Sequence, residues 1–156
     1  MNNYTEQREW SDRFIPEICA LVGPYLLKPA SFELDTQEAT DLIILTARDM
    51  RIAARIRKPG YEWADSEFTI RYWLPSCVKT ELQKVKEGWG DWMFYGHANP
   101  SGGIRIWHLL DLHVFRDQMN HRPDSVKWSE QKNGDGSKFI AFSISSFPSS
   151  MVVARG

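Results

Sequence analysis

The stretch that most constrains the fold runs from residue 40 to residue 73, where three short runs have the pattern of β-strands. The first run, 40–45, is apolar and begins with the carboxylate of Asp41. The other two, 51–58 and 67–73, alternate apolar and polar side chains. Successive side chains of a strand point to opposite faces, so each of these runs predicts one apolar and one charged face. The charged faces carry Arg51, Arg55, Arg57, Glu67 and Arg71.

Pairing of these three strands in chain order, as a meander, would bring carboxylates and guanidinium groups onto one face of a sheet. Such a cluster is the first place to look for function, because both kinds of group act on phosphates and metals.

The length and composition predict one domain over residues 1–156, long enough to bury a core. Aromatic residues make up 13% of the chain and include seven Trp. They favour a large aromatic core, with a stacking or partner-binding surface as the alternative. The formal net charge of −1 gives no global sign of nucleic-acid binding, so such binding needs a local basic patch.

The sequence also predicts a cytoplasmic protein without a membrane segment. No apolar run approaches the ~20 residues that a membrane helix needs, and no signal-peptide pattern is present. The two cysteines, Cys19 and Cys77, are too few for a disulfide framework or a zinc cluster.

The remaining pattern predicts helices as well as strands. The spacing of apolar residues indicates a helix from Pro16 onward that bends or ends at Gly23-Pro24. A second helix is expected over 78–87, with Ser76 as its N-cap and Gly88 at its end.

Further strands are expected at 91–97 and 104–110, followed by a short helix near 112–119. Residues 126–131 and 138–144 flank Asn-Gly-Asp-Gly at 133–136, which predicts a β-hairpin. The fold class is therefore mixed α/β (α+β), with a central mixed sheet flanked by helices and a C-terminal hairpin.

The order helix, three strands, helix, strand over residues 16–97 resembles the core of the PD-(D/E)XK (restriction-endonuclease-like) superfamily. The resemblance implies a divalent metal held by an upstream acid, an Asp that opens a strand, and a Glu-x-Lys on the next strand. Asp41 matches the strand-opening Asp, and Glu33 or Glu38 matches the upstream acid. Where Glu-x-Lys is expected, this chain has Arg55-Ile56-Arg57.

An arginine is always protonated and cannot ligate a cation, so the missing carboxylate must come from elsewhere. Glu67 supplies it if it faces Asp41, with Arg57 or Arg71 in the role of the lysine. The resulting prediction is a Mg²⁺ site of Asp41 and Glu67, assisted by Glu38, in a metal-dependent nuclease. Two alternatives stay open: structural ion pairs among these groups, and an anion site in which the arginines hold phosphate without catalysis.

A second cluster combines basic and aromatic residues and suits a DNA or RNA strand with stacked bases. It consists of Lys79, Lys84, Lys86, Trp89, Trp92 and Tyr95, and Arg55 adds to the expected nucleic-acid contacts. The alternative is a solvated helix on which Glu81 and Glu87 offset the lysines.

Other chemistry is not supported by the sequence. His108, Asp111 and His113 do not converge on a metal with either strand or helix spacing. No Gly-x-Ser-x-Gly elbow is present, and the glycine pairs are interpreted as turns.

The leading hypothesis is a nucleic-acid-interacting protein with a nuclease-like core. The competing hypothesis is a non-enzymatic inhibitor or adaptor, of the kind that viruses encode, which binds another protein through exposed aromatics. Its expected surface residues are Trp63, Trp89, Trp92 and Trp107.

Overall fold

The computed structural model describes residues 3–29, 42–44 and 50–156. The chain divides into two compact units, Met1–Met50 and Arg51–Gly156. The single domain expected over the whole length stays a prediction.

Within its described residues, the first unit contains two α-helices and a small sheet. Helix α1 spans Asn3–Asp12 and α2 spans Ile15–Val22. Pro16 lies in the first turn of α2, and the helix ends before Gly23-Pro24 in a 3-10 turn, Gly23–Leu26, as the sequence predicts. Strand β1 (Leu27–Pro29) pairs antiparallel with β2 (Leu42–Ile44).

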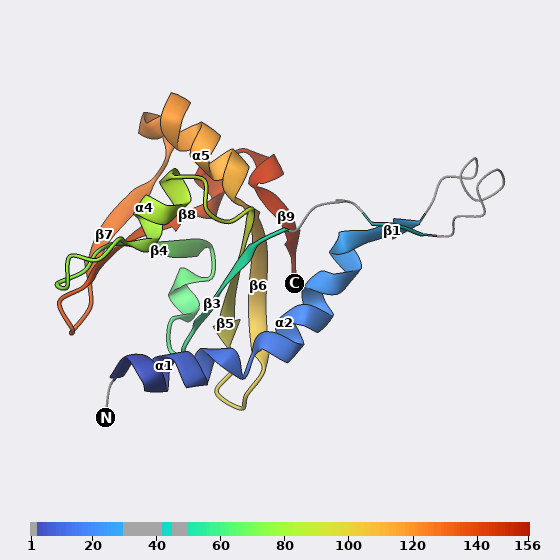
Figure 1. The fold of residues 1–156 in the computed structure, drawn as a ribbon, viewed down its shortest axis with the longest axis horizontal. Coiled ribbons are helices and arrows are strands. Elements are labelled where there is room, and N and C mark those ends of the chain that lie inside the picture. Colours follow the sequence, from blue (N-terminus) through green and yellow to red (C-terminus); the bar gives the residue numbers. More distant parts are fainter. Residues whose placement is uncertain (1–2, 30–41, 45–49) are drawn as a thin grey trace. The chain divides into compact units, whose positions relative to one another are not determined.

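The second unit is built on a mixed four-stranded sheet with the order β3-β5-β6-β9 (Figure 1). Strand β3 (Ile52–Arg57) lies parallel to β5 (Trp92–Ala98). Strand β6 (Ile104–Asp111) is antiparallel to both β5 and β9 (Val152–Arg155). The mixed α+β class with a central mixed sheet is therefore confirmed.

A second sheet has the order β4-β8-β7. Strand β4 spans Glu67–Trp73, and β7 (Trp128–Lys132) with β8 (Lys138–Ser143) forms the hairpin that residues 133–136 predict.

The expected meander of the runs at 40–45, 51–58 and 67–73 is wrong, because their strands β2, β3 and β4 lie in three different sheets. Strand β5 is buried along nearly its whole length and therefore takes a central position. It pairs with β3 on one side and β6 on the other, while β4 pairs with β8.

Two helices belong to this unit. Helix α4 spans Glu81–Lys86 and α5 spans Leu112–His121. The N-cap of α4 is Thr80 and not Ser76, because Thr80 and Gln83 form a reciprocal capping box. As a result Val78 lies outside the helix and is exposed.

The core of the second unit centres on four phenylalanines that all contact one another. Phe68 comes from β4, Phe115 from α5, Phe142 from β8, and Phe147 from the segment between β8 and β9. The six distances between their ring centroids lie between 5.3 and 6.2 Å. Phe68 also contacts the ring of Tyr95 on β5, so this phenylalanine cluster joins the two sheets and α5.

Among the described residues, no helix has the combination of length and apolar character that crossing a bilayer requires.

Replacing a member of the phenylalanine cluster will test this description of the core. Phe115 is fully buried, so Phe115→Ala is expected to lower the free energy of unfolding by about 3–5 kcal/mol. The exposed Val78 provides the control, and Val78→Ala should change it by no more than about 0.5 kcal/mol. Urea unfolding followed by circular dichroism measures both, and equal effects would contradict the proposed core.

Candidate functional site

The end of helix α4 fixes the position of an exposed tryptophan. The N–H of Trp89 donates to the carbonyl of Lys84, and the N–H of Gly88 donates to that of Val85, both at 3.0 Å. Together these bonds form a Schellman motif, in which Gly88 takes the left-handed φ of +91°. The sequence predicts the stop at Gly88, and the motif carries the chain away from the helix at Trp89.

Trp89 and three basic residues form the surface that we call the Trp89 corner: Arg51, Lys84, Lys86 and Trp89. The indole is 58% exposed. The guanidinium carbon of Arg51 lies 5.6 Å from its ring centroid, which is a cation–π contact. The backbone N–H of Arg51 donates to the Asp91 carboxylate at 2.9 Å, which fixes this side of the corner.

The charge of the Trp89 corner comes from two lysines whose ammonium groups are not offset. Lys84 and Lys86 are exposed and form no ion pair within the described part of the chain. The expected neutralisation by glutamates holds only for Lys79, whose Nζ lies 2.7 Å from Glu87. Glu81 pairs with Arg55 instead. A local positive surface therefore exists despite the near-neutral net charge.

The predicted metal ligands Asp41 and Glu38 lie outside the described residues, as does Glu33. Glu67 is half-buried at the start of β4 and forms no ion pair with any described residue.

The predicted phosphate-binding arginines have structural contacts. Arg57 donates from Nη1 to the Tyr95 hydroxyl at 3.1 Å, and its guanidinium lies over the rings of Tyr61 and Phe139. Arg55 is bonded to the carboxylate of Glu81, which also accepts the backbone N–H of Arg71 at 3.1 Å. The structural ion-pair alternative therefore describes Arg55.

The expected aromatic surface is corrected at two positions. Trp63 and Trp89 are exposed as predicted, but Trp92 is half-buried. Trp107 is buried, with its ring stacked on Phe94 at 5.5 Å. Strand alternation places Trp107 on the same face of the sheet as Phe94. The sequence does not show which face of β6 is covered.

A row of polar side chains crosses the four-stranded sheet, and no pattern in the sequence indicates it. In register, Arg55 of β3 lies beside Tyr95 of β5, Tyr95 beside His108 of β6, and His108 beside Arg155 of β9. Residues paired in register share a face, so these four side chains belong to one side of the sheet.

A second group of polar side chains surrounds His97 on the same strand as Tyr95. His97 is 2% exposed, and its Nδ1 lies 3.6 Å from the carboxylate of Asp65. Arg105 holds that carboxylate with two hydrogen bonds. The Tyr95 hydroxyl is hydrogen-bonded to Thr69 at 3.0 Å, which links the two sheets.

The pKa values of both buried histidines lie below their ordinary value. Burial is the main cause at His97, where Asp65 opposes it and Arg105, Arg57 and His108 add to it. Burial also lowers the pKa of His108, with help from Arg155 and against the attraction of Asp65. Both imidazoles are therefore neutral at pH 7.

Asp111 and His113 form structural contacts near the start of α5. Asp111 caps α5 by accepting the backbone N–H groups of His113 and Val114, while the ring of His113 contacts Asp91. Among the described residues there is no group of three or more His, Cys, Asp or Glu that could hold a metal.

Comparison of the chain with models of known protein families, with curated proteins and with solved structures gave no match. The resemblance to the PD-(D/E)XK core therefore stays a prediction, and function is argued from the geometry and charge of the described residues.

The lowered pKa values of His97 and His108 predict that stability falls in mild acid. Below the ordinary pKa of 6.5, the unfolded chain takes up protons that the folded chain does not, so the free energy of unfolding falls as the pH is lowered. Carboxylates with lowered pKa values, such as Asp65 and Glu62, add to this loss of stability only at lower pH, near their ordinary pKa values of 3.8 and 4.5.

Urea unfolding between about pH 5 and pH 7 will measure the slope of the free energy of unfolding against pH. His97→Gln and His108→Gln should each flatten it. His121→Gln, at the exposed end of α5, is the matched control and should leave it unchanged. A slope equally steep in all three variants would rule out the buried histidines as its cause.

Proposed function

We propose that the protein binds single-stranded nucleic acid, DNA or RNA, through the Trp89 corner. The observation that carries the proposal is an exposed indole beside the guanidinium of Arg51, next to two lysines without ion pairs among the described residues. An exposed ring offers a stacking surface for one base, and the ammonium groups neutralise the adjoining phosphates.

The single-stranded form is favoured because stacking on Trp89 needs an unstacked base. A duplex presents only its phosphates and base edges, so it would use the lysines and leave the indole without a partner. Lys79 contributes less than Lys84 and Lys86, because it is engaged by Glu87.

Metal-dependent phosphodiester cleavage is the catalytic part of the same proposal. Glu67 supports it, because its carboxylate forms no ion pair with a described residue. It therefore suits the role of an oxygen ligand of Mg²⁺, with water and phosphate oxygens completing the shell of the ion. Arg71 follows Glu67 on β4 with two-residue alternation, so both side chains belong to one face, where a guanidinium could stabilise developing phosphate charge.

A protein-binding inhibitor or adaptor is the second candidate function. Trp63 and Trp128 favour it, since they are 70% and 57% exposed. Trp128 lies on β7, which is the edge of its sheet and has no further strand partner among the described residues. An exposed edge strand with an aromatic anchor can take up an extended peptide.

Binding to a fluorescein-labelled oligothymidylate, measured by fluorescence polarisation, tests the Trp89 corner. Trp89→Ala should weaken binding by about 1–3 kcal/mol through the lost stacking. Lys84→Gln combined with Lys86→Gln should reduce the salt slope by about 1.4, because two phosphate contacts are lost.

Trp63→Ala is the matched control for the indole, since Trp63 is the more exposed tryptophan. It should bind like the unchanged protein. Equal losses in the two tryptophan variants would contradict the assignment, and no binding at low salt would favour the protein-binding candidate.

Cleavage is tested with the same labelled strand in the presence of Mg²⁺ or Mn²⁺ and separately with EDTA. Glu67→Gln should abolish the cleavage seen with metal while binding persists, because the amide removes a negatively charged ligand. Glu130→Gln, on the exposed strand β7, is the control and should cleave normally. If the labelled oligonucleotide stays uncleaved with both metals, the catalytic part of the proposal is excluded and only the binding part remains.

A further inference from the structure

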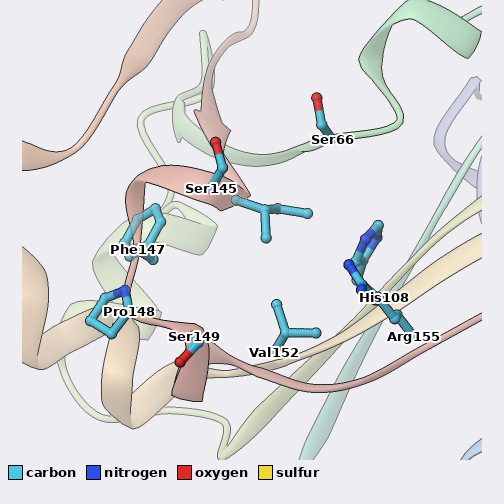
Figure 2. Close-up of a pocket in the computed structure, with 9 residues that line it drawn as sticks. Ser66, His108, Ser145, Phe147, Pro148, Ser149, Val152 and Arg155 are labelled. Carbon is cyan, nitrogen blue, oxygen red and sulfur yellow. The ribbon is translucent and has the colours of Figure 1, made fainter.

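A cavity of about 540 Å³ lies between the start of β4, strands β6 and β9, and the segment that joins β8 to β9. Its volume falls within the range of small-molecule sites. Most of its wall is apolar and consists of Ile144, Phe147, Pro148 and Val152. Figure 2 shows His108 and Arg155 together on one side, opposite Phe147 and Pro148.

The polar side of the cavity is built into the sheet. His108 and Arg155 are register partners on β6 and β9, so their side chains share the face that the cavity adjoins. Within the described part of the chain, Arg155 has no carboxylate partner. Asp65, which attracts His108 electrostatically, is already bound by Arg105. The cavity therefore carries a positive charge that the described residues do not balance.

His108 also has an unused hydrogen-bonding atom. The residue is only 8% exposed, and its Nδ1 is buried without a partner among the described residues. A buried polar atom without a partner is costly, typically about 1–3 kcal/mol, so it calls for an explanation. A hydrogen-bonding ligand in the adjoining cavity provides one.

We propose that this cavity binds a small organic anion, a phosphate monoester or a carboxylate attached to a flat apolar body. The anionic oxygens accept hydrogen bonds from the Arg155 guanidinium and from His108 Nδ1–H. The body packs on Ile144, Phe147, Pro148 and Val152. This site is separate from the Trp89 corner and does not depend on nucleic-acid binding.

The chemistry of the walls sets the selectivity. An inorganic anion can pair with Arg155 but leaves the apolar wall exposed to water, while a neutral analogue packs on that wall but leaves the guanidinium unpaired. Both should therefore bind more weakly than the complete ligand. An anion beside His108 also favours the imidazolium, so binding should raise the pKa of His108 against the effects of burial and Arg155.

Isothermal titration calorimetry with four probes distinguishes the sources of the anion. The probes are adenosine 5′-monophosphate, indole-3-acetate, inorganic phosphate and adenosine. The proposal expects at least one of the first two to bind, and more tightly than the last two. Preference for the nucleotide identifies a phosphate monoester, and preference for indole-3-acetate identifies a carboxylate.

Arg155→Gln should weaken binding of the preferred probe by roughly 10- to 100-fold, because a charged hydrogen-bond donor is lost. Arg122→Gln, at the end of α5 and outside the cavity lining, is the matched control and should bind normally. Arg155 is exposed, so its replacement should leave the fold intact. NMR titration of the His108 ring protons in the unchanged protein provides a second measurement, and its pKa should rise with the preferred probe bound.

Three results would each overturn the proposal: no binding of either organic anion at millimolar concentration, equal losses in Arg155→Gln and Arg122→Gln, or a His108 pKa unaffected by the bound probe. None of them bears on the Trp89 corner. Conversely, Trp89→Ala should bind the preferred probe normally, so failure of one proposal is distinguishable from failure of the other.

Discussion

The mutual packing of four phenylalanine rings is the interaction on which the second unit depends. Phe68, Phe115, Phe142 and Phe147 come from β4, α5, β8 and the segment before β9, elements that are far apart in the sequence. Each ring contacts the other three, so loss of one weakens three contacts at once. This packing holds the second sheet and α5 together, and through Phe68 and Tyr95 it connects to the four-stranded sheet.

Buried polar groups adjoin this apolar core along β5. Met93, Tyr95 and His97 alternate along β5 and therefore face the same side, with Met93 and Tyr95 in the core. Beyond Tyr95 the apolar core gives way to hydrogen-bonded groups: the hydroxyl of Tyr95 contacts both Thr69 and Arg57. Burial of these groups is offset by such bonds, whereas the ring nitrogens His97 Nε2 and His108 Nδ1 find no partner among the described residues. Phe147 belongs both to the phenylalanine cluster and to the cavity wall, so core packing also shapes the cavity beside His108.

The sequence predicts most strands of the second unit but not their partners. Alternation locates β3, β4, β5 and β6 and the hairpin, because it reports which residues face a covered side. It does not report which strands pair side by side, so the separation of β3 and β4 into two sheets could not be predicted. The capping box of Thr80 and Gln83 was a readable signal, since Thr-x-x-Gln is its pattern, yet Ser76 is an equally suitable cap by residue type. The polar row could not be predicted, because Arg155 reaches His108 only when β9 pairs with β6.

The strand order also separates the two proposed sites physically. Arg51 directly precedes β3 at one edge of the four-stranded sheet, whereas Arg155 lies on β9 at the other edge. Three strand spacings of about 4.8 Å place these edges roughly 14 Å apart. Groups separated by more than about 7–10 Å and without shared partners usually act additively. Arg51 contacts Trp89 and Asp91, while Arg155 influences His108, so none of these contacts is shared. The basic surface and the cavity therefore use the same sheet as a scaffold but act as independent sites.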